Sequence, residues 1–437
     1  MSEVQLSIED RILGLSKIWQ EANYNFAHFD QVPDLDWEAA YQDFLPKVIE
    51  AEDLYTYYRL LQQFTALLED AHSSIYFPPH LNEEIVSPPI QIEKIREKFY
   101  FVNLDKSLEQ ELPLFAELLR INGKETKEYL EAEVLPFTSA SAPHSQQYWA
   151  TQDLLKGRIG EKIQIEFEHE GRTGNWEGIQ GKIESTNWIR NPFKKAQDVA
   201  CEFTAEGIAH LQINNFNSEA VLDAFRKQIP LLYSSNAILL DLRYNLGGNS
   251  QIAREILKYF TEAQLIPKVQ GSTRKHLPSH KALGSFLAFQ PHTDWKPTEA
   301  DQVLFMKYYQ GRVWELEENR PYINDQQAQK LLVPILVLTS PDTASSSEDF
   351  LVSFQSLNRG KIMGSKTCGS TGAAVFFKLP GGGMARICAR KCTYPDSREF
   401  VGYGIEPDIP IELSLEDWKK GDSLKNKGID LLKDLIL

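Results

Sequence analysis

Three short, mostly apolar runs constrain the fold of this 437-residue chain more than any other feature. They span residues 237–242, 333–338 and 361–364, and a segment with helical spacing follows each of the first two. Strands this apolar are typically buried on both faces, as in parallel sheets that are covered by helices. Their alternation with helices predicts an α/β fold for the C-terminal half of the chain.

The chain is too long for one ordinary core, so we expect three domains. Residues 1–85 predict an N-terminal helical domain, because apolar residues recur with one-face spacing from Leu60 to Leu68. Residues 86–190 contain short alternating strands such as 162–167, and an Asn122-Gly123 hairpin turn. This order of elements resembles a PDZ domain. Residues 191–437 then form the α/β domain, interrupted by a long polar and aromatic connection over about 265–330.

Charge and hydropathy exclude several classes of partner. The net charge of −15 disfavours binding to phosphate backbones, so we expect no nucleic acid partner. No apolar run is long enough to predict a membrane span. The N-terminus lacks the basic start and apolar stretch of a secretory signal, which predicts a cytoplasmic protein, or a periplasmic one if a signal has been removed.

The cysteines and histidines do not predict a metal site. Cys388 and Cys392 lie four residues apart, but no second close pair completes a zinc-binding pattern, and we expect four reduced cysteines. His276 and His280 have ligand-like spacing but flank Pro278, which breaks a helical face. We therefore expect neither a metal nor an organic cofactor.

A first strand–loop–helix unit ends in a glycine pair. The strand over 237–242 is followed by Gly247 and Gly248, and a helix begins shortly after them. Free backbone amides at such a place attract negative charge. One interpretation is an oxyanion hole for acyl transfer, since the Gly-Lys-Ser/Thr ending of a phosphate-binding loop is missing. The alternative is an ordinary strand-to-helix turn.

A second unit carries the most informative serine. The strand over 333–338 leads into Thr343-Ala344-Ser345-Ser346-Ser347-Glu348, and a helix follows. Ser345 and Glu348 have the spacing of a capping box, which explains both residues by helix geometry alone. The alternative is a serine displayed where a strand meets a helix, with its hydroxyl facing a cleft. The local pattern leaves both interpretations open.

Taken together, the motifs resemble the tail-specific proteases. The resemblance rests on Asp-Leu-Arg-x-Asn-x-Gly-Gly at 241–248, Thr-Ala-Ser-x-Ser-Glu at 343–348 and Gly-Ile-Glu-Pro-Asp-Ile at 404–409, in this order. It implies a ClpP/crotonase-like α/β catalytic domain behind a PDZ-like module. It also implies that Ser345 is the nucleophile and that Gly247 or Gly248, with Ser346, forms the oxyanion hole.

The identity of the catalytic base separates two branches of this family. The C-terminal processing branch uses a lysine after the nucleophile, but Ser370 stands at that position here and Lys366 is four residues away. The tricorn-core branch, which resembles retinoid-binding-protein repeats, uses a histidine from an N-terminal helical segment. Asp70-Ala71-His72-Ser73 resembles that motif and implies His72 as base. By pattern alone, His72 also fits a core histidine that continues the apolar face of its helix.

The group that orients the base is less well defined. In the tricorn branch, a serine before the histidine links it to a glutamate, but Ala71 replaces that serine here. The position equivalent to the glutamate holds Val401, and Glu399 is the nearest carboxylate. The resemblance therefore implies Glu399 as the orienting group, with a backbone carbonyl as the alternative.

We therefore expect a serine peptidase in which His72 takes the proton of Ser345 during attack on a peptide or on the C-terminal tail of a protein. The expected partner is a peptide or an unfolded protein substrate. An unperturbed histidine would make activity rise through about pH 6.5 unless burial shifts it. Two alternatives remain at this point: a catalytically silent ligand- or peptide-binding protein on the same fold, and an esterase. The oligomeric state is open.

Overall fold

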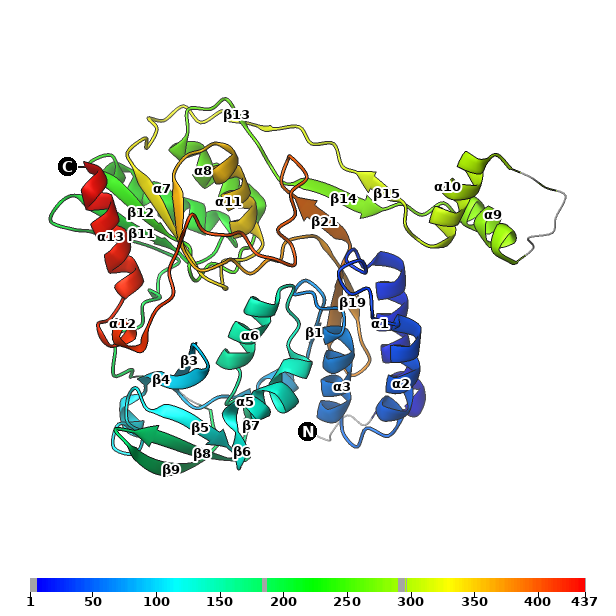
Figure 1. Cartoon of the computed structure of the whole chain (residues 1–437), viewed down its shortest axis with the longest axis horizontal. Coiled ribbons are helices and arrows are strands. Elements are labelled where there is room, and N and C mark those ends of the chain that lie inside the picture. The colour runs from blue at the N-terminus through cyan, green and yellow to red at the C-terminus, as the bar shows by residue number, and fades with distance from the viewer. Residues whose placement is uncertain (1–5, 183–186, 290–294, 296, 437) are drawn as a thin grey trace.

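A six-stranded sheet forms the centre of the C-terminal half in the computed structural model, which describes residues 6–182, 187–289, 295 and 297–436 (Figure 1). All neighbouring strands are parallel except the first pair. The predicted α/β fold is thus confirmed. In spatial order the strands are β10 (Val199–Phe203), β11 (Ile208–Ile213), β12 (Ala237–Asp241), β17 (Ile335–Thr339), β18 (Lys361–Gly364) and β22 (Ile409–Pro410).

Helices cover both faces of this sheet, which explains why its central strands are so apolar. One face packs against α7 (Glu219–Leu232), α8 (Ser250–Leu257) and α11 (Ser346–Ser356). The other packs against α13 (Ser423–Ile436) (Figure 1). Leu240 points into the first layer and Leu239 into the second, as strand geometry requires of adjacent residues.

The N-terminal helices do not form a core by themselves. They are α1 (Ile8–Asn25), α2 (Trp37–Ile49) and α3 (Leu54–Ala66). Their apolar cluster includes Ala385, Ile387 and Cys388, from a three-stranded sheet whose order is β1 (Ser74–Tyr76), β20 (Met384–Cys388) and β19 (Ala374–Lys378). Strands from late in the sequence are therefore built into the N-terminal layer.

The expected helical position of His72 is wrong. Helix α3 ends at Ala66, and residues 69–73, which we name the His72 turn, connect it to β1. Glu69 in this turn has a φ of 46°, which an α-helix cannot contain. His72 is therefore displayed by a turn between a helix and a strand.

A second, antiparallel sheet carries the β-rich region, in the order β3 (Ile90–Ile95), β4 (Lys98–Leu104), β5 (Glu117–Ile121), β8 (Lys162–His169) and β9 (Arg172–Ile179). The alternation predicted within 162–167 is confirmed, since Ile163, Ile165 and Phe167 are all buried. Asn122 and Gly123 form the expected tight turn, with φ values of 48° and 81°. We propose that this region is PDZ-like and that domains divide near residues 85 and 190.

The long connection over 265–330 is an extension rather than a simple loop (Figure 1). Strand β14 (Gln270–Arg274) pairs with β15 (Trp314–Leu316) and with β21 (Arg390–Thr393). The helices α9 (Pro278–Phe289) and α10 (Glu299–Tyr309) pack on each other at its far end.

The remaining elements are short. They are α4 (Pro79–Asn82), α5 (Thr126–Tyr129), α6 (Pro143–Gln152), α12 (Leu415–Lys419), β2 (Ile85–Val86), β6 (Lys124–Glu125), β7 (Gly157–Arg158), β13 (Leu265–Ile266) and β16 (Tyr322–Ile323).

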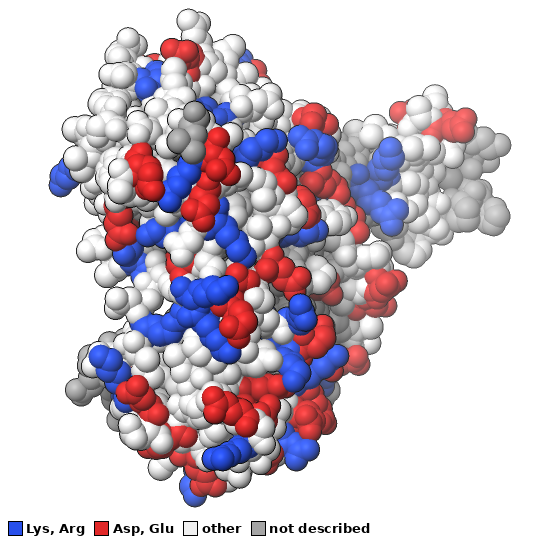
Figure 2. All heavy atoms as spheres, turned by 60° about the vertical axis from the view of Figure 1, so that its left-hand side comes forward, with Lys and Arg blue, Asp and Glu red and all other residues white. Residues whose placement is uncertain are grey.

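The surface carries both signs of charge. Figure 2 shows basic and acidic side chains interspersed on one face, so the net charge of −15 is not gathered there into a single acidic expanse. Within the part of the chain that the structure describes, no helix is both long enough and apolar enough to cross a membrane.

Candidate active site

Ser345 sits at the junction between β17 and α11 in a conformation that is rare for a side-chain-bearing residue. Its φ is 55° and its ψ is −120°. Backbone strain of this kind persists only where surrounding contacts hold it. The Ser345 amide donates to the carbonyl of Ser370 at 2.9 Å and to Oε2 of Glu348 at 3.3 Å. This sharp turn, residues 343–347, is named the Ser345 elbow below.

The histidine predicted from a distant part of the sequence meets this serine. His72 Nε2 lies 3.3 Å from Ser345 Oγ, although 273 residues separate them. The ring's other nitrogen, Nδ1, lies 2.7 Å from Ser370 Oγ. A proton on Nδ1 leaves Nε2 free to accept the Ser345 proton, which is the arrangement that a general base needs.

Contacts from two other segments hold the His72 turn in place. The amide of Ala71 donates to Ser141 Oγ at 3.1 Å, and Arg386 Nη2 donates to the carbonyl of Ala71 at 2.8 Å. Inside the turn, Ser73 Oγ donates to Asp70 Oδ2 at 2.7 Å. The position of His72 therefore depends on the segment that precedes α6 and on β20, as well as on contacts within the His72 turn.

Glu348 links the Ser345 elbow to the loop that carries Ser370. It is fully buried and accepts from Thr367 Oγ1 at 2.5 Å, from the Gly369 amide at 2.8 Å and from the Ser370 amide at 2.9 Å. Burial raises the pKa of Glu348 to about 7, while these donors act in the opposite direction. The carboxyl thus fixes both the serine and the hydroxyl that faces the histidine.

Two backbone amides beside Ser345 are free to receive an anion. Among the described residues, the amides of Gly248 and Ser346 donate no hydrogen bond, whereas the Gly247 amide donates to Asn245 Oδ1 at 3.0 Å. Ser346 Oγ donates to the carbonyl of Gly248 at 2.7 Å and thereby holds the two loops together. Of the three predicted oxyanion residues, Gly248 and Ser346 have suitable amides.

Gly247 has a different use. Its φ is 96°, and a Cβ atom there would lie 2.6 Å from the Cβ of Ser345. The missing side chain therefore lets the glycine loop approach the serine closely.

The histidine is neutral near pH 7. Burial lowers the pKa of His72 to about 4, against the opposing influence of the Asp70 charge and with a smaller contribution from Arg386. The expectation of a normal histidine value near 6.5 is replaced by a lower one.

Comparison with known proteins finds a family match over the central sheet and its loops. The family model described as "Peptidase family S41" matches residues 207–411. These residues form a domain of peptidase family S41. The match contains Ser345, Gly248 and Ser370, and His72 lies outside it.

Two curated relatives point the same way. The chain is 21% identical to the carboxyl-terminal-processing protease of Picosynechococcus sp. over 389 residues, covering 86% of this chain and 78% of that protein. It is 27% identical over 113 residues to a protein of Staphylococcus aureus named probable CtpA-like serine protease, covering 24% of this chain and 23% of the relative. The chain is accordingly a serine-type peptidase, and the silent binding protein is not favoured.

A solved structure shares the fold outside the S41 domain as well. Mature CPAF in complex with lactacystin superposes with a TM-score of 0.72 at 14% identity, and the match covers 98% of each chain. The arrangement of helical, β-rich and α/β regions is therefore that of a known structure.

The structure does not bring Glu399 to His72. Glu399 is exposed, and its backbone forms an antiparallel β-bridge with Thr393. Within the described ranges, no hydrogen bond joins Glu399 to His72. The group beside His72 Nδ1, where Glu399 was expected, is instead the hydroxyl of Ser370. From the sequence, Ser370 was identified only as the residue that replaces the catalytic lysine of the C-terminal processing branch.

The reacting groups line an open pocket of about 1100 Å³ in which the S41 domain meets the His72 turn. Its walls include the aromatic side chains of Trp149, Tyr244 and Phe376 and the cationic side chains of Lys194 and Arg386. A space of this size can take several residues of an extended peptide.

Other positions of the Asp-Leu-Arg-x-Asn motif in the S41 domain support the loops. Asn245 is fully buried, and its carbonyl accepts from the Ala344 amide at 3.1 Å and from Ser347 Oγ at 2.9 Å. Arg243 donates to both Asp241 and Asp422 at 2.7 Å. The asparagine in the Asp-Leu-Arg-x-Asn pattern was the available signal for this role, which sequence reasoning did not assign.

Proposed function

We propose that this serine peptidase uses Ser345 as nucleophile and His72 as general base, with Ser370 in place of the usual carboxylate beside the histidine. One observation carries the proposal. His72 Nε2 is 3.3 Å from Ser345 Oγ while Nδ1 is 2.7 Å from Ser370 Oγ, so the ring bridges two serines from different parts of the S41 domain. A 3.3 Å contact is close enough to shorten when substrate closes the site.

The reaction follows from these positions. His72 Nε2 removes the proton of Ser345 as the oxygen attacks the substrate carbonyl, and a tetrahedral intermediate forms. The free amides of Gly248 and Ser346 stabilise its oxyanion. His72 then protonates the leaving amine as the C–N bond breaks, and the acyl group stays on Ser345 Oγ. His72 next takes a proton from the attacking water and returns it to Ser345 Oγ as the ester bond breaks and the acid product leaves.

Ser370 orients the ring in this proposal. Its hydroxyl accepts from Nδ1–H and keeps Nε2 unprotonated, and its amide is anchored on Glu348 at 2.9 Å. A hydroxyl carries no charge, so it stabilises the imidazolium less than a carboxylate does. The buried Asp70 supplies negative charge nearby, because it raises the pKa of His72 against the effect of burial.

The proposed substrates are peptides and the C-terminal tails of proteins. The relative from Picosynechococcus is named for carboxyl-terminal processing, and the pocket holds two cationic side chains, Lys194 and Arg386, that suit a carboxylate. The PDZ-like region would provide a second contact for a chain end.

A fluorophosphonate probe and a peptide panel test this proposal. Ser345 should be labelled in the wild type, and peptides with free C-termini should be cleaved faster than their amidated counterparts. Labelling at another serine would remove Ser345 as nucleophile. Equal rates for the two peptide sets would leave the Ser345–His72 mechanism standing and would reject the preference for chain ends.

A further inference from the structure

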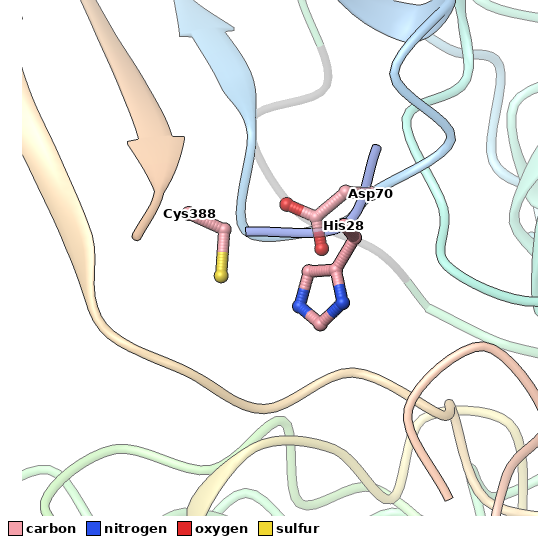
Figure 3. Close-up of side chains that lie close together, drawn as sticks. All are labelled: His28, Asp70 and Cys388. Carbon is pink, nitrogen blue, oxygen red and sulfur yellow. The ribbon is translucent and has the colours of Figure 1, made fainter. Parts of the chain in front are cut away.

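A buried cluster next to the His72 turn has the composition of a metal site. The side chains of His28, Asp70 and Cys388 offer one nitrogen, one oxygen and one sulfur atom, all within 4.8 Å of one another. Their exposed fractions are 2%, 1% and 0%. Figure 3 shows the three groups approaching one another from separate stretches of chain.

The imidazole of His28 is the first indication that the cluster binds a ligand. Both ring nitrogens are buried, and neither has a hydrogen-bond partner. One of them must carry a proton, and one must offer a lone pair. Leaving such groups unsatisfied costs about 1–3 kcal/mol each, so native proteins rarely leave both ends of a histidine unused.

The carboxylate of Asp70 is the second sign. It accepts hydrogen bonds from Ser73 Oγ at 2.7 Å and from Ser141 Oγ at 3.1 Å, but it forms no ion pair among the residues that the structure describes. A buried charge normally has a cationic partner or coordinates a metal. Hydroxyl donors alone leave the negative charge of Asp70 uncompensated.

The neighbouring cations are engaged elsewhere. Lys391 forms an ion pair with Asp30. Arg386 donates to the Ala71 carbonyl at 2.8 Å and to Ser74 Oγ at 2.9 Å. Glu399 is the other charged group that acts on His28, and it is exposed. Neither Lys391 nor Arg386 therefore forms an ion pair with Asp70.

We propose that His28, Asp70 and Cys388 bind a zinc ion that fixes the His72 turn to the S41 domain. Imidazole, carboxylate and thiolate are all common zinc ligands, and a thiolate disfavours calcium and magnesium. Zinc bonds of about 2.0–2.3 Å in a tetrahedron place ligand atoms roughly 3.3–3.8 Å apart, which small side-chain rotations would achieve here. A water molecule takes the fourth position.

Binding is balanced in charge and in protons. The thiol of Cys388 loses its proton to solvent as the zinc–sulfur bond forms. One thiolate and one carboxylate then neutralise the divalent ion, which removes the cost of burying Asp70 alone. His28 binds through the lone pair of a neutral imidazole, as a metal ligand must.

The position of the site gives the ion its role. Asp70 lies two residues before His72, Cys388 ends β20, and His28 follows α1. These three segments already touch through the Ala27 amide, which donates to the Cys388 carbonyl at 2.9 Å, and the Cys388 amide, which donates to Ser73 Oγ at 3.0 Å. An ion held between them would keep His72 at its distance from Ser345 without touching the substrate.

Metal content tests this proposal without depending on catalysis. The full-length Ser345→Ala protein is stripped with a chelator, incubated with zinc, freed of excess metal and measured by elemental analysis. We expect one zinc per chain. Cobalt in place of zinc should give the thiolate-to-cobalt charge-transfer absorption that reports a sulfur ligand. Zinc should also raise Tm.

Matched variants separate the site from general damage. Cys388→Ser and His28→Asn should lower zinc affinity by at least the roughly 10- to 100-fold that loss of an outer-shell partner causes. Cys392→Ser changes another buried cysteine four residues away and should retain the metal. Folding of each variant is checked by circular dichroism, and the cobalt spectrum of the parent protein decides the question if a variant does not fold.

Two results would overturn the zinc site. The first is a stripped protein that takes up neither zinc nor cobalt, which would mean that water satisfies His28. The second is a cobalt spectrum without a thiolate band, or an unchanged affinity in Cys388→Ser, because either would place the metal elsewhere.

Discussion

The two halves of the proposed catalytic pair are supported in different ways. Ser345 sits on an elbow that the central sheet, Asn245 and the buried Glu348 hold from within one domain. His72 sits on a turn whose contacts come from Ser141 and Arg386, far away in the sequence. The nucleophile is positioned by folding within one domain, whereas the base is positioned by contacts with distant segments of the chain.

Because of this difference, the two sides of the site should respond differently to substitution. A change in the Ser345 elbow affects residues that the sheet already needs for its own packing. A change around the His72 turn can misplace the base while the S41 domain stays folded, since displacement of about 1 Å at a catalytic group costs on the order of a hundredfold in rate.

Removing the nucleophile should cause the largest loss. We expect Ser345→Ala to reduce kcat/KM by at least about a thousandfold and to abolish fluorophosphonate labelling, because no other group can form the acyl-enzyme. The unfolding curve should change little, since alanine preserves the backbone at this position. Ser139→Ala changes another serine that lines the pocket and serves as the control, in which Ser345 should still be labelled. Retained hydrolysis in Ser345→Ala would refute the mechanism.

Removing the base tests the docked side. We expect His72→Ala to lower kcat/KM by about a thousandfold and to suppress labelling of Ser345, because the serine hydroxyl is not ionised without it. The exposed His80 lies eight residues on, and His80→Ala should behave as the wild type. Full labelling of Ser345 in His72→Ala would show that another group activates the serine.

Displacing the oxyanion amide should have an intermediate effect. Gly248 has a φ of 135°, and an added Cβ would lie 2.6 Å from the carbonyl carbon of Phe216. We expect Gly248→Ala to shift the amide and lower kcat by about 100- to 1000-fold. Steady-state kinetics of Gly382→Ala provide the control, because Gly382 also has a positive φ, 96°, but open space around it. Equal activity in the two variants would exclude the Gly248 amide from the oxyanion hole.

Removing the hydroxyl beside the histidine should cost less. Ser370→Ala deletes one neutral hydrogen bond to Nδ1, worth about 0.5–1.5 kcal/mol, so we expect kcat/KM to fall by about 2- to 10-fold. Ser370→Thr keeps the hydroxyl and should restore most of the activity. A loss near a thousandfold in Ser370→Ala would mean that this hydroxyl does more than orient the ring, and no loss would mean that it does not orient it.

The pH profile should show the smallest change over the ordinary range. Burial lowers the pKa of His72 to about 4, and the neutral ring is the active form, so the base is available above that pH and is lost as pH falls through it. We therefore expect protonation of His72 to cause no loss of kcat/KM from about pH 6 to 8 and a tenfold loss per unit in acid below its pKa. Circular dichroism at each pH separates this loss from unfolding. Half-loss near pH 6.5 would contradict the lowered pKa of His72.

Much of the Ser345 side could be read from the sequence. The apolar runs at 237–242 and 333–338 have the composition of strands covered on both faces, and the glycine pair and the serine follow them directly. Adjacent parallel strands end at the same edge of a sheet, so their loops must meet. Gly248, Ser345 and Ser346 lie together for this reason.

The His72 side could be predicted only in part. The motif around His72 suggested a base, but the expected helix ended at Ala66 and the expected partner Glu399 lies exposed. Ser370 took that place because Glu348 anchors its amide and β20 brings Arg386 against the turn. The contact between Glu348 and Ser370 spans 22 positions and the contact between Arg386 and Ala71 spans 315, so no local spacing encodes them.

Short-range patterning was enough to predict the class of fold, the serine elbow and the serine-peptidase class, because it specifies strands, helices and the loops between neighbouring strands. It could not predict which groups surround the histidine, which amides remain free, or that His28 and Cys388 converge on Asp70 in the His72 turn. These arrangements come from packing between distant segments, where burial and hydrogen-bond satisfaction select the partners.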